Sequence, residues 1–234
     1  PRAEPTPKPT PMPDPTAKPT ERPDPTEPSV LAMDLAAKAC PGGVLLDWTK
    51  PSPEVGHYHT LRKVGGDVPP TYPAAGTTEV ETATSFGAGT TDGFDVTISG
   101  GDSATYRTFA FDAADQVMAL SGTRTVTTIG RISLGTLNVT PGAAGSIDVS
   151  WAAADVNAAC FTYGKLVASQ DDPDPSYLKG SSYWAVVESP STTSVHLEGL
   201  PSGKTVWMRY EIVRVTSTGK FVVARTDVVQ VTIP

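Results

Sequence analysis

The stretch SIDVSW (residues 146–151) places three apolar side chains, Ile147, Val149 and Trp151, at alternate positions, with Ser, Asp and Ser at the other three. Side chains along a β-strand point alternately to opposite faces, so this pattern predicts a strand with one buried face. The stretch VLLDW (residues 44–48) repeats the alternation and also ends in tryptophan. The two stretches therefore predict two half-buried strands of the same kind.

Turn residues separate the predicted strands at short intervals, as in CPGG, VGGD, SGGD, TPGAAG, LPSG and STGK. Many short strands with such punctuation predict an all-β fold of antiparallel sandwiches. The stretch DLAAKA (residues 34–39) has helical composition, but it is too short and too close to Pro41 to predict a helix.

The strand set occurs twice, and each copy spans about 100 residues, a common size for one domain. We therefore predict two tandem domains, residues 30–129 and residues 130–234. Trp48 and Trp151 occupy equivalent strands, and we expect both to mark the cores of their domains.

At these residues the chain resembles the fibronectin type III family. Trp48 and Trp151 match the tryptophan of the family's second strand. The corner formed by Leu200, Pro201 and Gly203 resembles the Leu/Pro/Gly corner that precedes the family's sixth strand. The resemblance covers most of the chain. It implies two immunoglobulin-like sandwiches whose role is spacing, adhesion or assembly, because a fold of this kind does not by itself imply catalysis.

The chain departs from the family where a tyrosine normally follows that corner. Val206 takes its place in the second copy and Ala104 in the first, so the hydrogen bond of the tyrosine corner is absent. We expect Tyr106 and Met208, two positions later, to fill core space instead.

The N-terminal residues 1–29 form a separate segment, because residues 1–28 hold 11 of the 23 prolines. A ten-residue repeat runs from PTPKPTPMPD (residues 5–14) into PTAKPTERPD (residues 15–24). Proline restricts φ and removes an amide donor, so the segment favours extended polyproline II. We interpret it as an extended stalk or assembly arm.

Threonines that follow prolines recur along this arm and resemble the O-glycosylated stalks of secreted proteins. The candidate O-glycosylation sites are Thr6, Thr10, Thr16, Thr20 and Thr26. A plain linker is the alternative. A Pro/Thr stalk before such domains resembles the exposed part of bacterial surface proteins, so we expect an extracellular or cell-surface location.

The two cysteines lie near predicted domain ends. In an end-to-end tandem of such sandwiches, the loop before the second strand of domain one, with Cys40, faces the start of the third strand of domain two, with Cys160. We therefore predict an interdomain disulfide, which suits an exported chain. Two separate buried thiols are the alternative.

Candidate catalytic or metal-binding clusters are few. His57 and His59 share one strand face and His196 lies in the other domain, which is too few ligands for a zinc site. No Gly-x-Ser-x-Gly elbow, His-Glu-x-x-His motif or phosphate loop occurs. We expect no catalytic residues, no metal and no cofactor, and we interpret the chain as a non-enzyme.

Two acidic stretches, DDPDP (residues 171–175) and TTDGFD (residues 90–95), lack the spacing of a calcium loop, so we interpret them as solvated turns. Trp184 and Trp207 are candidate interface aromatics. Trp207 precedes Met208 on the opposite strand face. A candidate platform for a cell-surface glycan consists of Trp184, Trp207 and Tyr183, although core packing is the simpler interpretation.

The formal net charge of −7 argues against nucleic acid as a partner, because phosphate binding relies on clustered Lys and Arg. No apolar run in the sequence approaches the roughly 20 residues needed to cross a bilayer.

Three functional hypotheses fit these features. The first is an extracellular structural subunit of a homopolymeric surface filament or layer, assembled through the N-terminal arm. The second is the sensing or adhesive ectodomain of a membrane-anchored bacterial protein. The third is a carbohydrate-binding accessory module of a secreted enzyme. The arm favours the first, because an extended segment can add to a neighbour's sheet edge.

Overall fold

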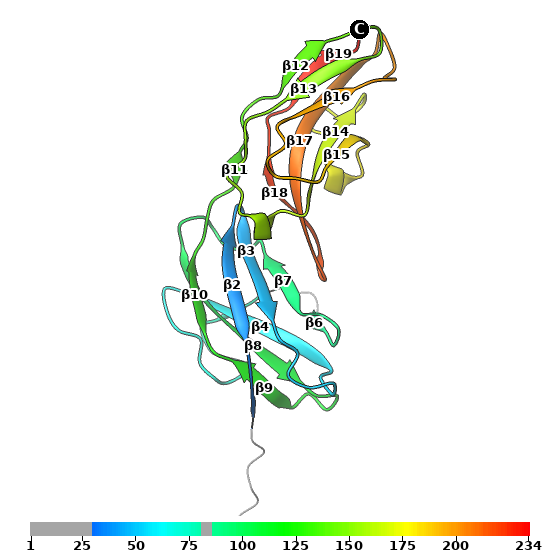
Figure 1. The fold of residues 1–234 in the computed structure, drawn as a ribbon. Helices are drawn as coiled ribbons and strands as arrows, with labels where there is room; N and C mark the ends of the chain where they lie inside the picture. The colour runs from blue at the N-terminus through cyan, green and yellow to red at the C-terminus, as the bar shows by residue number, and fades with distance from the viewer. Residues whose placement is uncertain (1–29, 81–85) are drawn as a thin grey trace, which may run out of the picture.

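A computed structural model describes residues 30–80 and 86–234. Figure 1 shows two β-sandwiches stacked end to end, with the first described strand at one pole and the C-terminus at the other. The predicted arm, residues 1–29, and its candidate glycosylation threonines lie outside the described residues. In the part of the chain that is described, no helix has the length and apolar character that a membrane crossing requires.

The first sandwich has two sheets, with strand orders β2-β3-β7 and β1-β9-β8-β4-β5, and β10 and β6 pair with β8 and β4. Its strands are β1 (Leu31–Met33), β2 (Leu35–Cys40), β3 (Gly43–Trp48), β4 (His57–Val64), β5 (Thr78–Val80), β6 (Phe86–Gly87), β7 (Asp92–Asp95), β8 (Ser103–Phe111), β9 (Val117–Ser121) and β10 (Arg124–Thr127).

The second sandwich has the sheets β12-β13-β16 and β11-β18-β17-β14-β15, and β19 also pairs with β17. Its strands are β11 (Ile132–Ser133), β12 (Asn138–Pro141), β13 (Ile147–Ser150), β14 (Tyr163–Ser169), β15 (Tyr183–Val187), β16 (Ser194–Leu197), β17 (Thr205–Thr216), β18 (Gly219–Arg225) and β19 (Val229–Thr232). Two 3₁₀ turns, η1 (Ala158–Cys160) and η2 (Tyr177–Lys179), complete it.

The same strand-pairing pattern occurs in both sandwiches. In the first, β1 pairs in parallel with β9 and the chain then crosses to pair β2 with β3. In the second, β11 pairs in parallel with β18 before β12 pairs with β13. The predicted all-β architecture of two sandwiches is therefore confirmed. The DLAAKA stretch is part of strand β2, because pairing with β3 outweighs its local helical preference.

Each core contains one of the two predicted tryptophans. Trp48 and Trp151 are both 5% exposed, and they contact Tyr58 and Tyr210, with ring centroids 5.6 and 4.2 Å apart. Tyr106 and Met208, the residues two positions after the missing corner tyrosines, are fully buried. Burial raises the pKa of Tyr210 to about 12.

A buried ion pair crosses the first core. Arg62 on β4 donates to the carboxylate of Asp95 on β7 at 2.7 Å, and the Tyr106 hydroxyl donates to the same carboxylate at 3.1 Å. Asp95 is 1% exposed. The prediction of a solvated turn at Asp92 and Asp95 is therefore wrong, because this stretch is a strand whose last carboxylate neutralises a buried guanidinium.

Candidate functional site

The junction between the sandwiches brings together the residues that the sequence analysis placed at facing poles. On the first domain, Cys40 ends β2, and the turn Pro41–Gly42 leads into β3. Gly42 has a φ of +75°, and a Cβ atom there would lie 2.9 Å from Cγ of Arg131. Glycine is therefore required at the tip of this hairpin for both conformation and space.

On the second domain, the short turn η1 positions Cys160. The Asn157 side chain caps this turn by accepting a hydrogen bond from the Ala159 amide at 3.0 Å. Asn is a preferred residue at such a cap because its side-chain oxygen satisfies an amide that would otherwise lack a partner. The cap holds Cys160 against the β2–β3 hairpin of the first domain.

Cys40 and Cys160 form a disulfide that joins the two domains. They are 120 residues apart in sequence, their Cα atoms are 5.6 Å apart, and both residues are fully buried. The described residues include no free cysteine. Closing a loop of this length removes unfolded-state entropy worth about 4–5 kcal/mol in the chain-entropy model. The bond also restrains the angle between the sandwiches.

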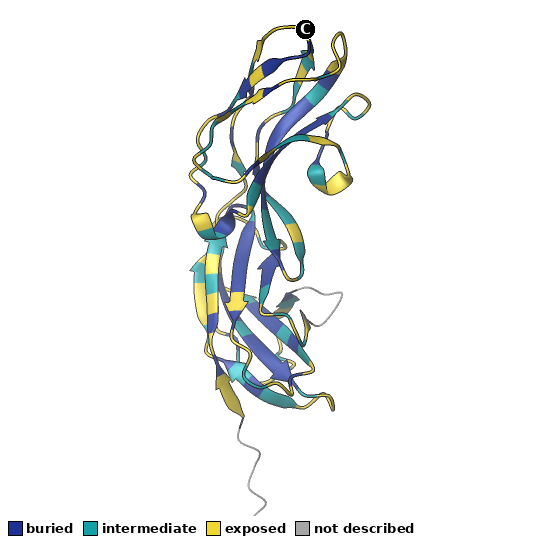
Figure 2. Ribbon diagram, turned by 45° about the vertical axis from the view of Figure 1, so that its right-hand side comes forward, coloured by how far each residue is buried: buried dark blue, intermediate teal, exposed yellow. Residues whose placement is uncertain are grey.

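Apolar side chains surround the disulfide. Along β3, Val44 and Leu46 belong to the first domain's own core, whereas Leu45, on the other face, joins the hydrophobic cluster of the second domain. Its cross-strand neighbour Phe94 joins the same cluster and stacks on Phe221, with ring centroids 5.0 Å apart. The second core thus extends into the first domain, and Figure 2 shows buried residues on both sides of the junction.

Polar contacts close one side of the junction. The Ser217 amide, in the β17–β18 turn, donates to the Asp92 carboxylate at 2.8 Å, and the Ser217 hydroxyl donates to the Asp92 carbonyl at 3.0 Å. Arg214 lies 3.9 Å from the same carboxylate. Burial and the nearby charge of Asp92 raise the pKa of Asp47. The β17–β18 hairpin of the second domain therefore contacts the edge of the first domain at Asp92 (Figure 1).

The segment that connects the two domains, around Ile129, packs on the β2–β3 hairpin of the first domain. The Gly42 amide donates to the Ile129 carbonyl at 3.1 Å, and Pro41 forms a parallel bridge with Ile129. A connector with such main-chain contacts has less freedom than a solvated linker.

The candidate interface aromatics lie away from this junction. Trp184 is partly buried against the second core and lines a hollow of about 340 Å³ with Asp171 and Val206. Trp207 is partly exposed on β17, opposite Gln230, whereas its neighbour Met208 is fully buried.

The three histidines pair with carboxylates. His59 contacts Glu79, and His57 lies 3.8 Å from Asp115. His196 bonds to Asp148 at 2.7 Å and to Glu198 at 3.1 Å, and these hydrogen bonds raise its pKa. Within residues 30–80 and 86–234, no group of three or more potential ligands is arranged for a metal ion.

The second acidic stretch takes part in ion pairs. Asp174 bonds to Lys179 at 2.7 Å and to Arg209 at 2.5 Å, and the hydrogen bond from Lys179, followed by the charge of Arg209, lowers its pKa. Although Asp171 and Asp172 remain in a turn, Asp174 anchors the loop to β17. The Asp174 side chain is nevertheless 53% exposed, so this stretch agrees with the solvated-turn interpretation and gains ion pairs in addition.

Comparisons with known proteins give fold-level similarity. No protein-family model matches the chain, and no curated protein matches it. Among solved structures, it is similar to the FN1–FN3 domains of chicken CNTN1, with 13% identity over 88% of this chain and 69% of that one, at a TM-score of 0.42.

A two-domain fibronectin type III segment of chicken tenascin shares 13% identity over 85% of this chain and 95% of that one, at a TM-score of 0.32. The sixth such domain of human fibronectin type III domain containing protein 3 shares 16% identity over 47% of this chain and 91% of that one, at a TM-score of 0.34. At these scores the assignment of the fold rests on the strand pairings described above.

Proposed function

We propose that this chain is a non-enzymatic extracellular structural protein, in which two sandwiches act as one stiff rod. The observation that carries the proposal is the junction, where the Cys40–Cys160 disulfide is embedded in a shared hydrophobic cluster. Domains in one chain move relative to one another unless their interface is large and apolar. A covalent bond within an apolar contact opposes that motion.

The disulfide supports an oxidising location, because such bonds persist outside the cytosol. A rod of this kind needs no catalytic chemistry to transmit force or set a spacing. We place it at a cell surface, as in the bacterial proteins that the Pro/Thr arm and tandem domains resemble.

In finer detail, we propose that the rod is a subunit of a surface filament or layer, assembled through residues 1–29. The arm precedes β1, which lies at the pole opposite the second domain (Figure 1). An arm leaving this pole is positioned to meet the far end of a neighbouring rod. A head-to-tail contact of that kind does not close, so it generates a fibre.

Negative-stain microscopy of the intact chain beside a chain lacking residues 1–28 tests the assembly. We expect filaments from the intact chain and single rods from the truncated one. Filaments from both chains, or from neither, would contradict arm-driven assembly. The truncated chain keeps both sandwiches, so its rod shape tests the stiff junction independently of assembly.

A further inference from the structure

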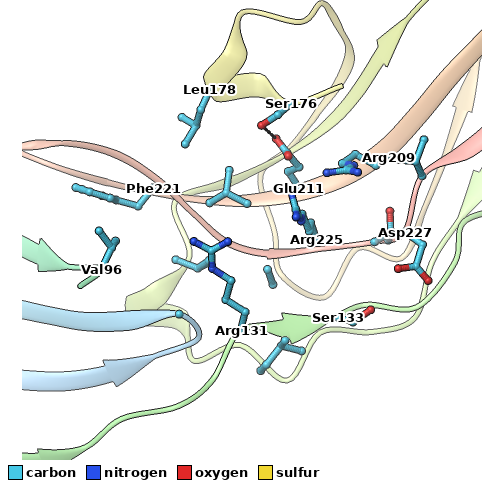
Figure 3. A pocket seen from close by; sticks show the side chains of 17 residues that line it. Val96, Arg131, Ser133, Ser176, Leu178, Arg209, Glu211, Phe221, Arg225 and Asp227 are labelled. Atoms are coloured by element: carbon cyan, nitrogen blue, oxygen red, sulfur yellow. Dashed lines mark hydrogen bonds between the residues drawn. The ribbon is translucent and has the colours of Figure 1, made fainter. Parts of the chain in front are cut away.

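A pocket of about 580 Å³ opens beside the junction (Figure 3). Its floor is the outer face of strands β17 and β18, and its other walls come from the first domain, the connecting segment and the loop containing η2. The charged and large apolar side chains that a ligand would meet there include Arg131, Leu178, Arg209, Glu211, Phe221 and Arg225. Volumes of this size are typical of small-molecule sites.

Glu211 supplies a buried acceptor with unused capacity. It is fully buried, and its Oε2 accepts hydrogen bonds from the Tyr177 amide at 2.8 Å and from the Ser176 hydroxyl at 3.3 Å. Its Oε1 has no hydrogen-bond partner among the described residues. A buried polar atom without a partner costs free energy, so a ligand that donates to Oε1 would bind favourably.

Arg209 supplies unused donors at the same floor. It is 5% exposed, and its Nη2 donates to Asp174 at 2.5 Å. Its Nε and Nη1 are buried and have no acceptor within the described chain. A hydrogen-bond acceptor on Glu211 and donors on Arg209, all without partners, therefore lie two residues apart on the same face of β17.

Three arginines, Arg131, Arg209 and Arg225, line the pocket against two carboxylates, Glu211 and Asp227, so its charge favours an anion even though the chain is acidic overall. Strand register places Glu211 between Lys165 on β14 and Arg225 on β18, so its charge has two basic neighbours. Arg131 is exposed at the rim, and among the described residues neither Arg131 nor Arg225 has a carboxylate within 4.0 Å. Guanidinium groups bind carboxylates in bidentate geometry.

We propose that this pocket binds a uronic acid unit of an acidic polysaccharide. The carboxylate of the sugar meets Arg131 and Arg225. Hydroxyl groups, which both donate and accept, satisfy Oε1 of Glu211 and the free nitrogens of Arg209. The apolar face of the pyranose ring lies against Phe221 and Leu178, which Figure 3 shows on the same side of the pocket as each other. A simple anion lacks the donor that Glu211 requires.

The site depends on the domain angle because both domains line it. Gly42, two residues after Cys40, forms part of the wall and packs beneath Arg131. Loss of the Cys40–Cys160 bond would therefore loosen the position of Arg131 relative to Glu211. Binding is expected to weaken in a chain with Cys40→Ser and Cys160→Ser.

Calorimetry and amide NMR titration of the intact, oxidised chain test the proposal. The probes are short oligomers of galacturonate, glucuronate and mannuronate, their methyl esters, an Asp-rich peptide and sodium sulfate. We expect at least one uronate oligomer to bind, with shifts at residues around Glu211 and Arg225, and its methyl ester to bind at least about tenfold more weakly because the charge-assisted bonds are lost.

Matched variants distinguish binding in this pocket from nonspecific attraction of uronates to positive charge on the surface. Arg131→Gln is expected to weaken uronate binding about tenfold or more, whereas Arg124→Gln, on the exposed strand β10, removes the same charge and leaves binding unchanged. Glu211→Gln keeps the size of the buried side chain, and thermal unfolding checks its fold. Failure of every uronate to bind, equal loss in the Arg131 and Arg124 variants, or preference for the peptide or sulfate would overturn the proposal.

Discussion

Phe94 of the first sandwich stacks on Phe221 of the second, with ring centroids 5.0 Å apart and an interplanar angle of 26°. Phe94 is 2% exposed, although it lies on the face of β7 turned away from its own core. The second domain therefore buries a side chain that the first domain alone would leave in water. The two sandwiches share apolar surface as well as a covalent bond.

Phe94→Ala is expected to destabilise the junction by about 3–5 kcal/mol, because a buried aromatic is replaced by a cavity. Urea unfolding with the disulfide intact measures the loss. Exposed Val64→Ala is a suitable control, because Val64 is 51% exposed and its truncation removes little buried area. Equal small losses in the two variants would show that Phe94 contributes little at the junction.

Asp95→Ala is expected to cost about 3–5 kcal/mol of stability, because it leaves the Arg62 guanidinium buried without its carboxylate. The double variant Arg62→Met with Asp95→Ala should recover part of that loss. Chemical unfolding of the two single variants and the double variant gives the coupling energy. Additive losses would contradict a coupled ion pair.

His196 is expected to titrate above 6.5, because its hydrogen bonds to Asp148 and then to Glu198 favour the charged ring. The folded pKa is raised, so this interaction stabilises the fold below pH 6.5 and its contribution is lost as pH rises through the folded value. NMR titration of the imidazole measures the pKa. Asp148→Asn should move it back toward 6.5, and an unchanged pKa in that variant would contradict the assignment.

The two sandwiches could be predicted from the sequence because period-two alternation and turn residues are local signals. The disulfide could be anticipated because only two cysteines occur and the family's tandem geometry places their loops together. The buried role of Asp95 was missed because its partner lies on a distant strand. A signal existed: Arg62 shares a strand face with Tyr58 and Thr60, so an inward-facing cation required a carboxylate.

The shared apolar surface also had a signal that was not used. In VLLDW, Leu45 places an apolar side chain on the strand face that the alternation predicts to be exposed. Its cross-strand neighbour Phe94 does the same in β7. An apolar residue on the outer face of a strand indicates a second packing partner. The pocket had no such signal, because its walls come from several segments that are far apart in the sequence and meet only after the domains dock.

A stiff rod requires that the junction hold the two sandwiches as one rigid body. Residual dipolar couplings of backbone amides, measured in the oxidised chain and fitted separately for residues 30–129 and 130–234, test it most directly. We expect one alignment tensor, with the same magnitude and orientation in both domains. Tensors of clearly different magnitude would show independent domain motion and would contradict the stiff rod on which the proposed function rests.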